Sequence, residues 1–287
     1  MTESSAYNFP CNLCGNTTHR LLYMKKNFPI VRCTKCGLVS TVLPENFDTR
    51  TIYDETYFKG GQVDGYADYE SSEKILKSEF KKVLNKLLSY FPDTKGKKLL
   101  EIGSAYGYFL DEAKNYFDCY GVEVSTDGVQ QSVKRGLNVF EGVLDQNLLR
   151  KTGKVDAVVM LDVIEHLPDP SGTLKMIYEA MNPGGVILIV TGDHSSLLSR
   201  IMKDNWRLMT PPQHTFFFSN KTLPMMAESA GFKVLSVNAP WKIVPFGLPF
   251  YQVGRRTGIR IKALENINNF GIPVNLFDTV RVIARKN

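Results

Sequence analysis

Long apolar runs are missing from this sequence of 287 residues. The most apolar loop-like stretch, IVPFGLPFY, is short and contains two prolines, whereas a membrane helix needs about 20 consecutive apolar residues. The opening MTESSAYNFP lacks the basic start and apolar centre of a secretory signal. Internal repeats and low-complexity segments are also absent. With 43% apolar and 22% charged residues, the chain is predicted to be a cytoplasmic globular protein without membrane contact.

Excess charge of one sign is confined to the C-terminal segment. Residues 240–287 hold eight lysines and arginines against Glu265 and Asp278, which accounts for the net charge of +6. Such a segment is compatible with binding a phosphate, a nucleotide sugar or RNA. A solvated surface is the simpler interpretation.

Cysteine is scarce, but four of the five fall in two pairs, CNLC and CTKC. Two C-x2-C pairs at this spacing, in a chain without a secretory signal, are typical of a structural tetrathiolate zinc site. Disulfides are disfavoured in a reducing compartment. We therefore expect residues 1–45 to form a zinc ribbon, and Cys119 to be a small core residue. The expected zinc ligands are Cys11, Cys14, Cys33 and Cys36.

Strand-like and helix-like segments alternate through the rest of the chain. Residues 46–95 are expected to form a linker followed by a helix, because apolar residues recur at helical spacing from Glu73 to Tyr90. From residue 96 to 287, apolar strands such as KLLEIGS and GGVILIVTG alternate with helical patterns. Repeated βα units of this kind predict an α/β fold with a doubly wound, mainly parallel sheet covered on both faces.

The first strand-to-helix turn of this region, EIGSAYG, is the expected binding turn. It lacks the G-x-G-x-x-G spacing of a dinucleotide site. Glu101 lies two residues before Gly103, the first glycine of the turn. An acid there suits a ligand with a cationic or hydrogen-bond-donating end rather than a pyrophosphate. Glu123 ends the second strand and can accept hydrogen bonds from ribose hydroxyls. S-adenosylmethionine, which has a ribose and no phosphate, meets both requirements.

At this point the sequence resembles class I S-adenosylmethionine-dependent methyltransferases. The resemblance is carried by LLEIGSAYGYFL, YGVEVS, VVMLDVIEHLPDP and MNPGGVILIVT, over residues 96–240 and the last strand. It implies a Rossmann-like, seven-stranded sheet. The four-cysteine ribbon, YDETYF and PPQHTFFFS resemble the branch that modifies small metabolites, often sugars. One departure is Ala105, which replaces the middle glycine of the family's loop and is small enough to let the backbone approach a ligand.

The resemblance implies a set of cofactor contacts. Glu101 would serve the methionine end, where glycines let the backbone pass close to it. Glu123 would hold the ribose, the stretch near Leu144 would supply the adenine pocket, and Asp162 would lie beside the methyl group. Tyr57 either closes over the cofactor or packs between ribbon and core. The full set of expected cofactor residues is Glu101, Gly103, Ser104, Gly107, Glu123, Val124, Leu144, Asp145, Asp162, Val163 and Tyr57.

Transfer to a hydroxyl acceptor usually requires a base, and histidine suits that role because its pKa lies near working pH. His214, in a proline-anchored loop, is the first candidate and His166 the second. The alternative for each is a structural role in its turn. His194 is expected to help cap the following helix. Trp206 and Arg207 are weaker candidates for binding a sugar face and an anion.

Two functions thus remain open for the intact chain. The first is methylation, at oxygen or carbon, of a small acceptor such as a sugar or nucleotide sugar. The second is an RNA methyltransferase that holds RNA with its ribbon and basic C-terminal segment. The balanced charge of the ribbon and the lack of alternating basic and aromatic residues disfavour nucleic acid. A non-catalytic scaffold is disfavoured by the intact glycine turn and Glu123. Oligomeric state is not specified by the sequence.

Overall fold

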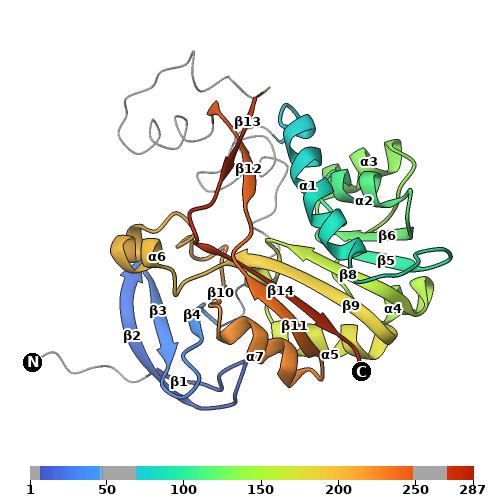
Figure 1. Cartoon of the computed structure of the whole chain (residues 1–287). Helices are drawn as coiled ribbons and strands as arrows, with labels where there is room; N and C mark the ends of the chain where they lie inside the picture. Colours follow the sequence, from blue (N-terminus) through green and yellow to red (C-terminus); the bar gives the residue numbers. More distant parts are fainter. Residues whose placement is uncertain (1–6, 46, 48–68, 248–269) are drawn as a thin grey trace, which may run out of the picture.

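The computed structural model describes residues 7–45, 47, 69–247 and 270–287 (Figure 1). Its central sheet consists of β5 (Lys98–Ile102), β6 (Asp118–Glu123), β7 (Asn138–Glu141), β8 (Val155–Leu161), β9 (Met181–Gly192), β11 (Lys233–Asn238) and β14 (Thr279–Arg285). The seven strands lie in the order β11–β14–β9–β8–β5–β6–β7. β5 to β9 pair in parallel, and β14 runs antiparallel between β9 and β11. The predicted doubly wound, mainly parallel, seven-stranded sheet is confirmed.

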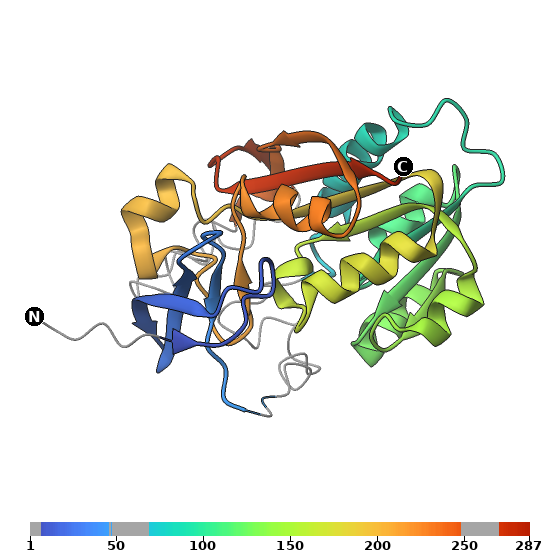
Figure 2. The ribbon, with the colours of Figure 1, turned by 90° about the horizontal axis from the view of Figure 1, so that it is seen from below.

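Helices cover both faces of this sheet (Figures 1 and 2). The helices are α1 (Glu73–Leu88), α2 (Tyr108–Ala113), α3 (Thr126–Lys134), α4 (Gln146–Thr152), α5 (Pro170–Ala180), α6 (Leu197–Met202), α7 (Thr222–Ser229) and the short 3-10 turns η3 (Ile164–His166) and η4 (Lys203–Asn205). α1 and α2 pack on one face, and α4, α5 and α7 pack on the other. The expected helix from residue 73 is present, whereas α4 was not predicted.

β9 shows why the sheet needs two covering layers. Its side chains alternate between faces, as the two-residue period of a strand requires. Val186, Leu188 and Val190 belong to the core beneath α1 and α2, while Ile187 and Ile189 belong to the core beneath α5 and α7. All five are buried. A strand that is apolar on both faces is stable only in the interior of the sheet, which is where β9 lies.

The cysteine-containing region forms a second sheet. Its strands are β1 (Tyr7–Asn8), β2 (Thr18–Lys25), β3 (Phe28–Cys33), β4 (Val39–Thr41) and β10 (Phe216–Phe217), in chain order across the sheet. β10 comes from the region expected to form the methyltransferase domain, yet it pairs with β4 in antiparallel register. The sheet of the expected ribbon, residues 1–45, is therefore completed by a strand from residues 96–287.

A second contact joins the ribbon to the start of α5. Asn12 lies between two of the cysteines, and its side-chain amide donates to Asp169 Oδ1 at 2.7 Å. The side-chain oxygen of Asn12, Oδ1, accepts from the Ser171 backbone N–H at 3.0 Å. Leu38 and Phe216 belong to the apolar core that also contains α5 and α7. Backbone, polar and apolar contacts thus fix the ribbon against the larger sheet.

A two-stranded ladder of β12 (Lys242–Pro245) and β13 (Gly271–Val274) lies between β11 and β14 in the chain. It contacts α1, where the Ile243 backbone N–H donates to Glu79 Oε2 at 3.0 Å. This ladder was not predicted, and it brings Lys242 to the carboxyl end of β8. Within the described ranges, no helix combines the length and apolar character needed to span a membrane.

Candidate cofactor and acceptor site

The turn after β5 requires glycine at two positions for steric reasons. Gly103 and Gly107 have φ angles of +73° and +75°, a left-handed conformation that residues with a side chain rarely adopt. A Cβ at Gly103 would lie 2.4 Å from Val163 Cγ2, and one at Gly107 would lie 2.4 Å from Leu137 Cδ1. The turn therefore brings its backbone closer to neighbouring elements than any larger residue would allow.

Ala105 stands where the sequence resemblance predicts a glycine in the middle of this turn, and Glu123 stabilises it there. Ala105 has a φ of +47°, which costs a residue with a Cβ about 1–2 kcal/mol. The buried Glu123 carboxylate accepts from the Ala105 backbone N–H at 2.7 Å and from the Ser125 backbone N–H at 2.8 Å. The small size of the alanine side chain, which the sequence suggests as the reason, does not by itself explain why alanine is tolerated at this position. Glu123 also holds the strained residue in place.

Glu101 lies at the carboxyl end of β5 with an unsatisfied oxygen. Its side chain is buried, and within the described residues Oε2 has no hydrogen-bond partner. Burial, and secondarily the negative charge of Glu123, raises the pKa of Glu101 well above its usual value. Ser104 Oγ is likewise buried without a partner among the described residues. Two orphaned polar atoms beside the glycine turn fit a ligand that donates hydrogen bonds or carries positive charge.

The expected adenine region has an additional structural role. Asp145 is the N-cap of α4, and its Oδ1 accepts from the Leu148 backbone N–H at 2.7 Å. Leu144 is half-buried against the core beneath α4, and Val124 is partly exposed just after β6. One side of the Asp145 carboxylate is thus already committed to the helix. Tyr57 lies outside the described residues.

Asp162 forms an ion pair that the sequence did not reveal. It directly follows β8 with a φ of +55°, and its Oδ2 lies 2.7 Å from Lys242 Nζ. Burial opposes the charge of Lys242, but Asp162 and Glu79 outweigh it and raise the lysine pKa. Val163, the next residue, packs against Gly103. The positions expected beside the methyl group therefore meet the glycine turn on one side and a partly buried lysine on the other.

The two candidate catalytic histidines lie together. The rings of His166 and His214 are 4.6 Å apart and nearly perpendicular. His166 Nδ1 lies 3.0 Å from the Gln213 carbonyl oxygen, so Nδ1 donates and carries the proton. His214 hydrogen-bonds to the Leu208 backbone. Burial lowers the pKa of both rings, and the neighbouring His166 lowers that of His214 further. Both imidazoles are neutral near pH 7.

Glu165 adjoins this pair and was not singled out from the sequence. Its side chain is 3% exposed, and burial together with Asp162 raises its pKa to about 8. Oε2 has no hydrogen-bond partner among the described residues. Ligand atoms of Glu165, His166 and His214 all lie within 4.8 Å of one another. The only sequence signal was its place next to His166 in DVIEH.

The ribbon holds His214 directly. The Thr41 hydroxyl at the end of β4 donates to the His214 carbonyl oxygen at 2.7 Å. The Thr41 backbone N–H donates to the Thr215 carbonyl oxygen at 2.8 Å, and the Thr215 N–H donates to the Glu165 carbonyl oxygen at 2.9 Å. A continuous line of hydrogen bonds thus runs from the ribbon through the His214 segment to η3.

The four paired cysteines converge. They are free thiols, and their sulfurs all lie within 4.8 Å of one another. Cys11 Sγ is 3.5 Å from Cys36 Sγ, and Cys14 Sγ is 3.7 Å from Cys33 Sγ. A tetrahedral site with Zn–S bonds of about 2.3 Å separates its sulfurs by roughly 3.8 Å. The arrangement therefore fits one zinc ion.

The structure gives His194, Trp206 and Arg207 structural contacts. Ser196, not His194, is the N-cap of α6. His194 is buried, and its Nε2 lies 3.4 Å from Tyr23 Oη. The Trp206 indole and the Arg207 guanidinium both donate to Asp278, the latter through two nitrogens at 3.0 Å. These contacts commit both side chains to the fold.

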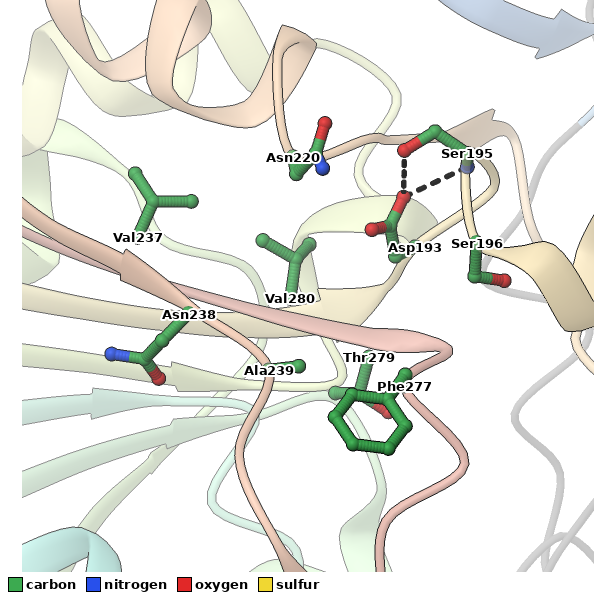
Figure 3. A pocket seen from close by; sticks show the side chains of 10 residues that line it. All are labelled: Asp193, Ser195, Ser196, Asn220, Val237, Asn238, Ala239, Phe277, Thr279 and Val280. Carbon is green, nitrogen blue, oxygen red and sulfur yellow. Dashed lines mark hydrogen bonds between the residues drawn. The ribbon is translucent and has the colours of Figure 1, made fainter.

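Figure 3 shows a pocket of about 560 Å³ at the same edge of the sheet, beyond the ends of β9 and β11. Asp193, Asn220, Asn238 and Thr279 are among its polar lining residues. Asp193 Oδ1 accepts from both the backbone N–H and the hydroxyl of Ser195, at 2.8 Å and 2.5 Å. Neither the glycine turn nor the histidine pair lines this pocket, so it holds none of the expected cofactor contacts.

A family model described as a methyltransferase domain matches residues 73–237. This range covers more than half of the chain and includes the glycine turn, Glu123 and both histidines of the pair. The chain therefore belongs to the methyltransferase-domain family.

Individual relatives are distant. The ubiquinone biosynthesis O-methyltransferase of Psychrobacter arcticus is 25% identical over 152 residues, covering 48% of this chain and 59% of that protein. The tRNA U34 carboxymethyltransferase of Campylobacter hominis is 29% identical over 179 residues, covering 57% and 61%. The chain thus spans about three-fifths of the length of these curated relatives.

Solved structures confirm the fold. An S-adenosylmethionine-dependent methyltransferase from Archaeoglobus fulgidus has a TM-score of 0.52 at 22% identity, covering 81% of this chain and all of that one. Magnesium protoporphyrin IX methyltransferase from Synechocystis, with bound S-adenosylhomocysteine, has a TM-score of 0.51 at 12% identity, covering 83% and 100%. The Rossmann-like methyltransferase fold is the common feature.

Proposed function

We propose that this protein binds S-adenosylmethionine and transfers its methyl group to a small-molecule acceptor. The observation that carries the proposal is the turn after β5, where Glu101 presents an unsatisfied buried oxygen beside backbone that only glycine permits. The ammonium of the methionine moiety would supply the missing positive charge, directly or through water. The sulfonium already activates the methyl group, so the protein has to align the partners and manage the acceptor's proton.

The remaining expected contacts belong to the same proposal. Glu123 uses both carboxylate oxygens on backbone N–H groups, and each oxygen keeps a further lone pair for a ribose hydroxyl. Val163 and Asp162 bound the methyl position. The acceptor's reacting group lies beside His214 and His166, the residues expected to handle its proton. A sugar or nucleotide sugar is the candidate acceptor, and the four thiols bind a structural zinc ion in a cytoplasmic protein.

Calorimetry of cofactor binding tests the central proposal. Wild-type protein should bind S-adenosylmethionine and S-adenosylhomocysteine, whereas Glu123→Gln should weaken both by about 1.5–3 kcal/mol, roughly 10- to 150-fold. Glu141→Gln is the matched control, because Glu141 ends the neighbouring strand β7 and is exposed. Unchanged affinity in Glu123→Gln, or binding of a nicotinamide dinucleotide in place of S-adenosylmethionine, would refute the proposal.

RNA remains the second candidate acceptor. The relative from Campylobacter hominis is named as acting on tRNA, and half of the eight lysines and arginines of residues 240–287 lie outside the described residues. Filter binding to bulk RNA at several salt concentrations distinguishes the candidates, because phosphate contacts make affinity fall steeply with salt. Micromolar affinity with a steep salt dependence would favour RNA, and no retention at low salt would favour a small acceptor.

A further inference from the structure

Glu165, His166 and His214 come from two segments that the fold binds together. η3 carries Glu165 and His166, and the loop before β10 carries His214. The Thr215 N–H to Glu165 carbonyl bond, at 2.9 Å, and the His166 contact with Gln213 join the two segments. The three ligand atoms lie within 4.8 Å of one another. Two ligand atoms bonded to one ion at about 2.0–2.4 Å lie about 3–4 Å apart at usual bond angles. The spacing of these three atoms is therefore compatible with one shared ion, with at most a small movement of the side chains.

Each of these side chains is oriented by a second contact, as metal ligands commonly are. The Gln213 carbonyl fixes the proton of His166 on Nδ1, which places the lone pair of that ring on Nε2. The Leu208 backbone orients the His214 ring, and Thr191 hydrogen-bonds to the Glu165 carboxyl group. The second carboxylate oxygen of Glu165 is buried and has no partner among the described residues. This orphaned oxygen is an observation independent of the histidines.

We propose that Glu165, His166 and His214 bind a divalent transition-metal ion at the acceptor site, separate from the cysteine cluster. Two imidazoles and one carboxylate suit Mn²⁺, Fe²⁺ or Zn²⁺ better than Mg²⁺, which prefers oxygen ligands. Three protein ligands leave coordination positions open for an acceptor. The ion therefore selects acceptors with an oxygen that can coordinate it, above all those with two adjacent oxygens.

The proposed ion replaces a strong base and rests on the proposed methyl transfer. A hydroxyl bound to the ion loses its proton to water at a lower pH than a free hydroxyl does. The resulting oxygen attacks the methyl carbon of S-adenosylmethionine, so a C–O bond forms and the C–S bond breaks. The electron pair of that bond stays on sulfur, and S-adenosylhomocysteine is released. With the ion bound, His166 and His214 hold the ion, and the proton leaves to water instead of passing to either imidazole as the sequence alone suggests.

Titration of zinc-loaded full-length protein with Mn²⁺, followed by electron paramagnetic resonance, tests the site. The protein is loaded with one equivalent of Zn²⁺ per chain, which occupies the cysteine cluster because thiolates prefer zinc to Mn²⁺, and the second site stays open. Wild-type protein should bind one further Mn²⁺, and Glu165→Gln and His214→Asn should each weaken that binding by at least about 10–100-fold. His194→Asn is the matched control, since His194 is also buried and lies outside the cluster.

A measurement on the wild-type protein avoids dependence on variant folding. Electron spin-echo modulation from the bound Mn²⁺ should show two directly bound imidazole nitrogens. Absence of Mn²⁺ binding at millimolar concentration, or bound Mn²⁺ without imidazole nitrogens, would overturn the inference. S-adenosylmethionine affinity, measured on the same samples, separates the two proposals. Retained cofactor binding without an ion refutes only the ion site, whereas Mn²⁺ binding without cofactor binding refutes the proposed function.

Discussion

Replacement of Thr41 by valine tests whether the ribbon positions the acceptor side of the site. Thr41 is buried, and its hydroxyl donates to the His214 carbonyl oxygen at 2.7 Å. Valine has nearly the same shape, so Thr41→Val removes this bond without opening a cavity. The His214 carbonyl then loses a buried donor. The backbone bond from Thr41 to Thr215 remains, so β4 and β10 stay paired.

The loss of one buried hydrogen bond with an acceptor left unsatisfied should lower the free energy of unfolding by about 1–2 kcal/mol. At about 2–4 °C per kcal/mol, the melting temperature should fall by roughly 2–8 °C. A purely structural role predicts no more than this. If Thr41 positions His214, Mn²⁺ affinity and turnover should also fall, while S-adenosylmethionine affinity, which depends on the opposite side of the cleft, should stay unchanged.

Thr34→Val is the matched control. The Thr34 hydroxyl donates to the Thr18 carbonyl oxygen at 2.9 Å within the same sheet, but Thr34 is exposed. Its replacement should change the free energy of unfolding by less than about 0.5 kcal/mol. Equal melting temperatures and equal Mn²⁺ affinities for Thr41→Val and Thr34→Val would show that the ribbon does not position His214.

Three further predictions concern single residues. Gly103→Ala should abolish S-adenosylmethionine binding and destabilise the fold by about 1–3 kcal/mol, because the new Cβ would lie 2.4 Å from Val163 Cγ2. Gly136→Ala is the control in calorimetry and melting, because Gly136 has the same φ of +73° and no atom of a non-adjacent described residue lies within 4 Å of the position that its Cβ would take. Burial lowers the pKa of His194 to about 4 in the folded protein, against about 6.5 in the unfolded chain. Between these pH values only the unfolded state binds the proton, so acidification should lower the free energy of unfolding by up to about 3 kcal/mol. Denaturation curves of His194→Gln should lack this loss. Metal analysis should find one zinc per chain less in Cys33→Ser than in the wild-type protein. Equal zinc contents in the two proteins would refute the tetrathiolate site.

The central sheet was predictable because its signals are local. β9 is apolar at successive positions over Val186–Val190, and such a run is stable only inside a covered parallel sheet. The glycine turn was predictable for the same reason, since Gly103 and Gly107 have left-handed conformations that few other residues adopt. The cysteine cluster follows from the spacing of two short pairs. In each case, a few neighbouring residues carry the whole constraint.

The missed features depend on contacts between distant parts of the chain. Lys242 pairs with Asp162 across 80 residues, and nothing in the local sequence of β12 indicates that partner. Glu165 is a polar residue in a polar turn, and only its burial beside His214 distinguishes it. Asp145 shows a different ambiguity. This residue, which the sequence predicts to contact the cofactor, also caps α4, because capping and ligand binding favour the same carboxylates.

The proposed acceptor side of the site depends on the ribbon for its hydrogen bonds. β10 has only two residues, and its strand partner is β4. Thr41 supplies donors to the carbonyl groups of His214 and Thr215. At the other end of the DVIEHLPDP motif, Asn12 holds Asp169 and the start of α5. Buried backbone groups that lose these partners lower the free energy of unfolding. A loosened ribbon should therefore displace His214 before it disturbs Glu123, because the hydrogen bonds of Glu123 are made within the larger domain. Binding at the two proposed metal sites would then be coupled: loss of the ribbon metal weakens binding at the acceptor site and, because coupling of binding equilibria is reciprocal, loss of the acceptor-site ion weakens the ribbon metal by the same factor, while the cofactor side remains intact.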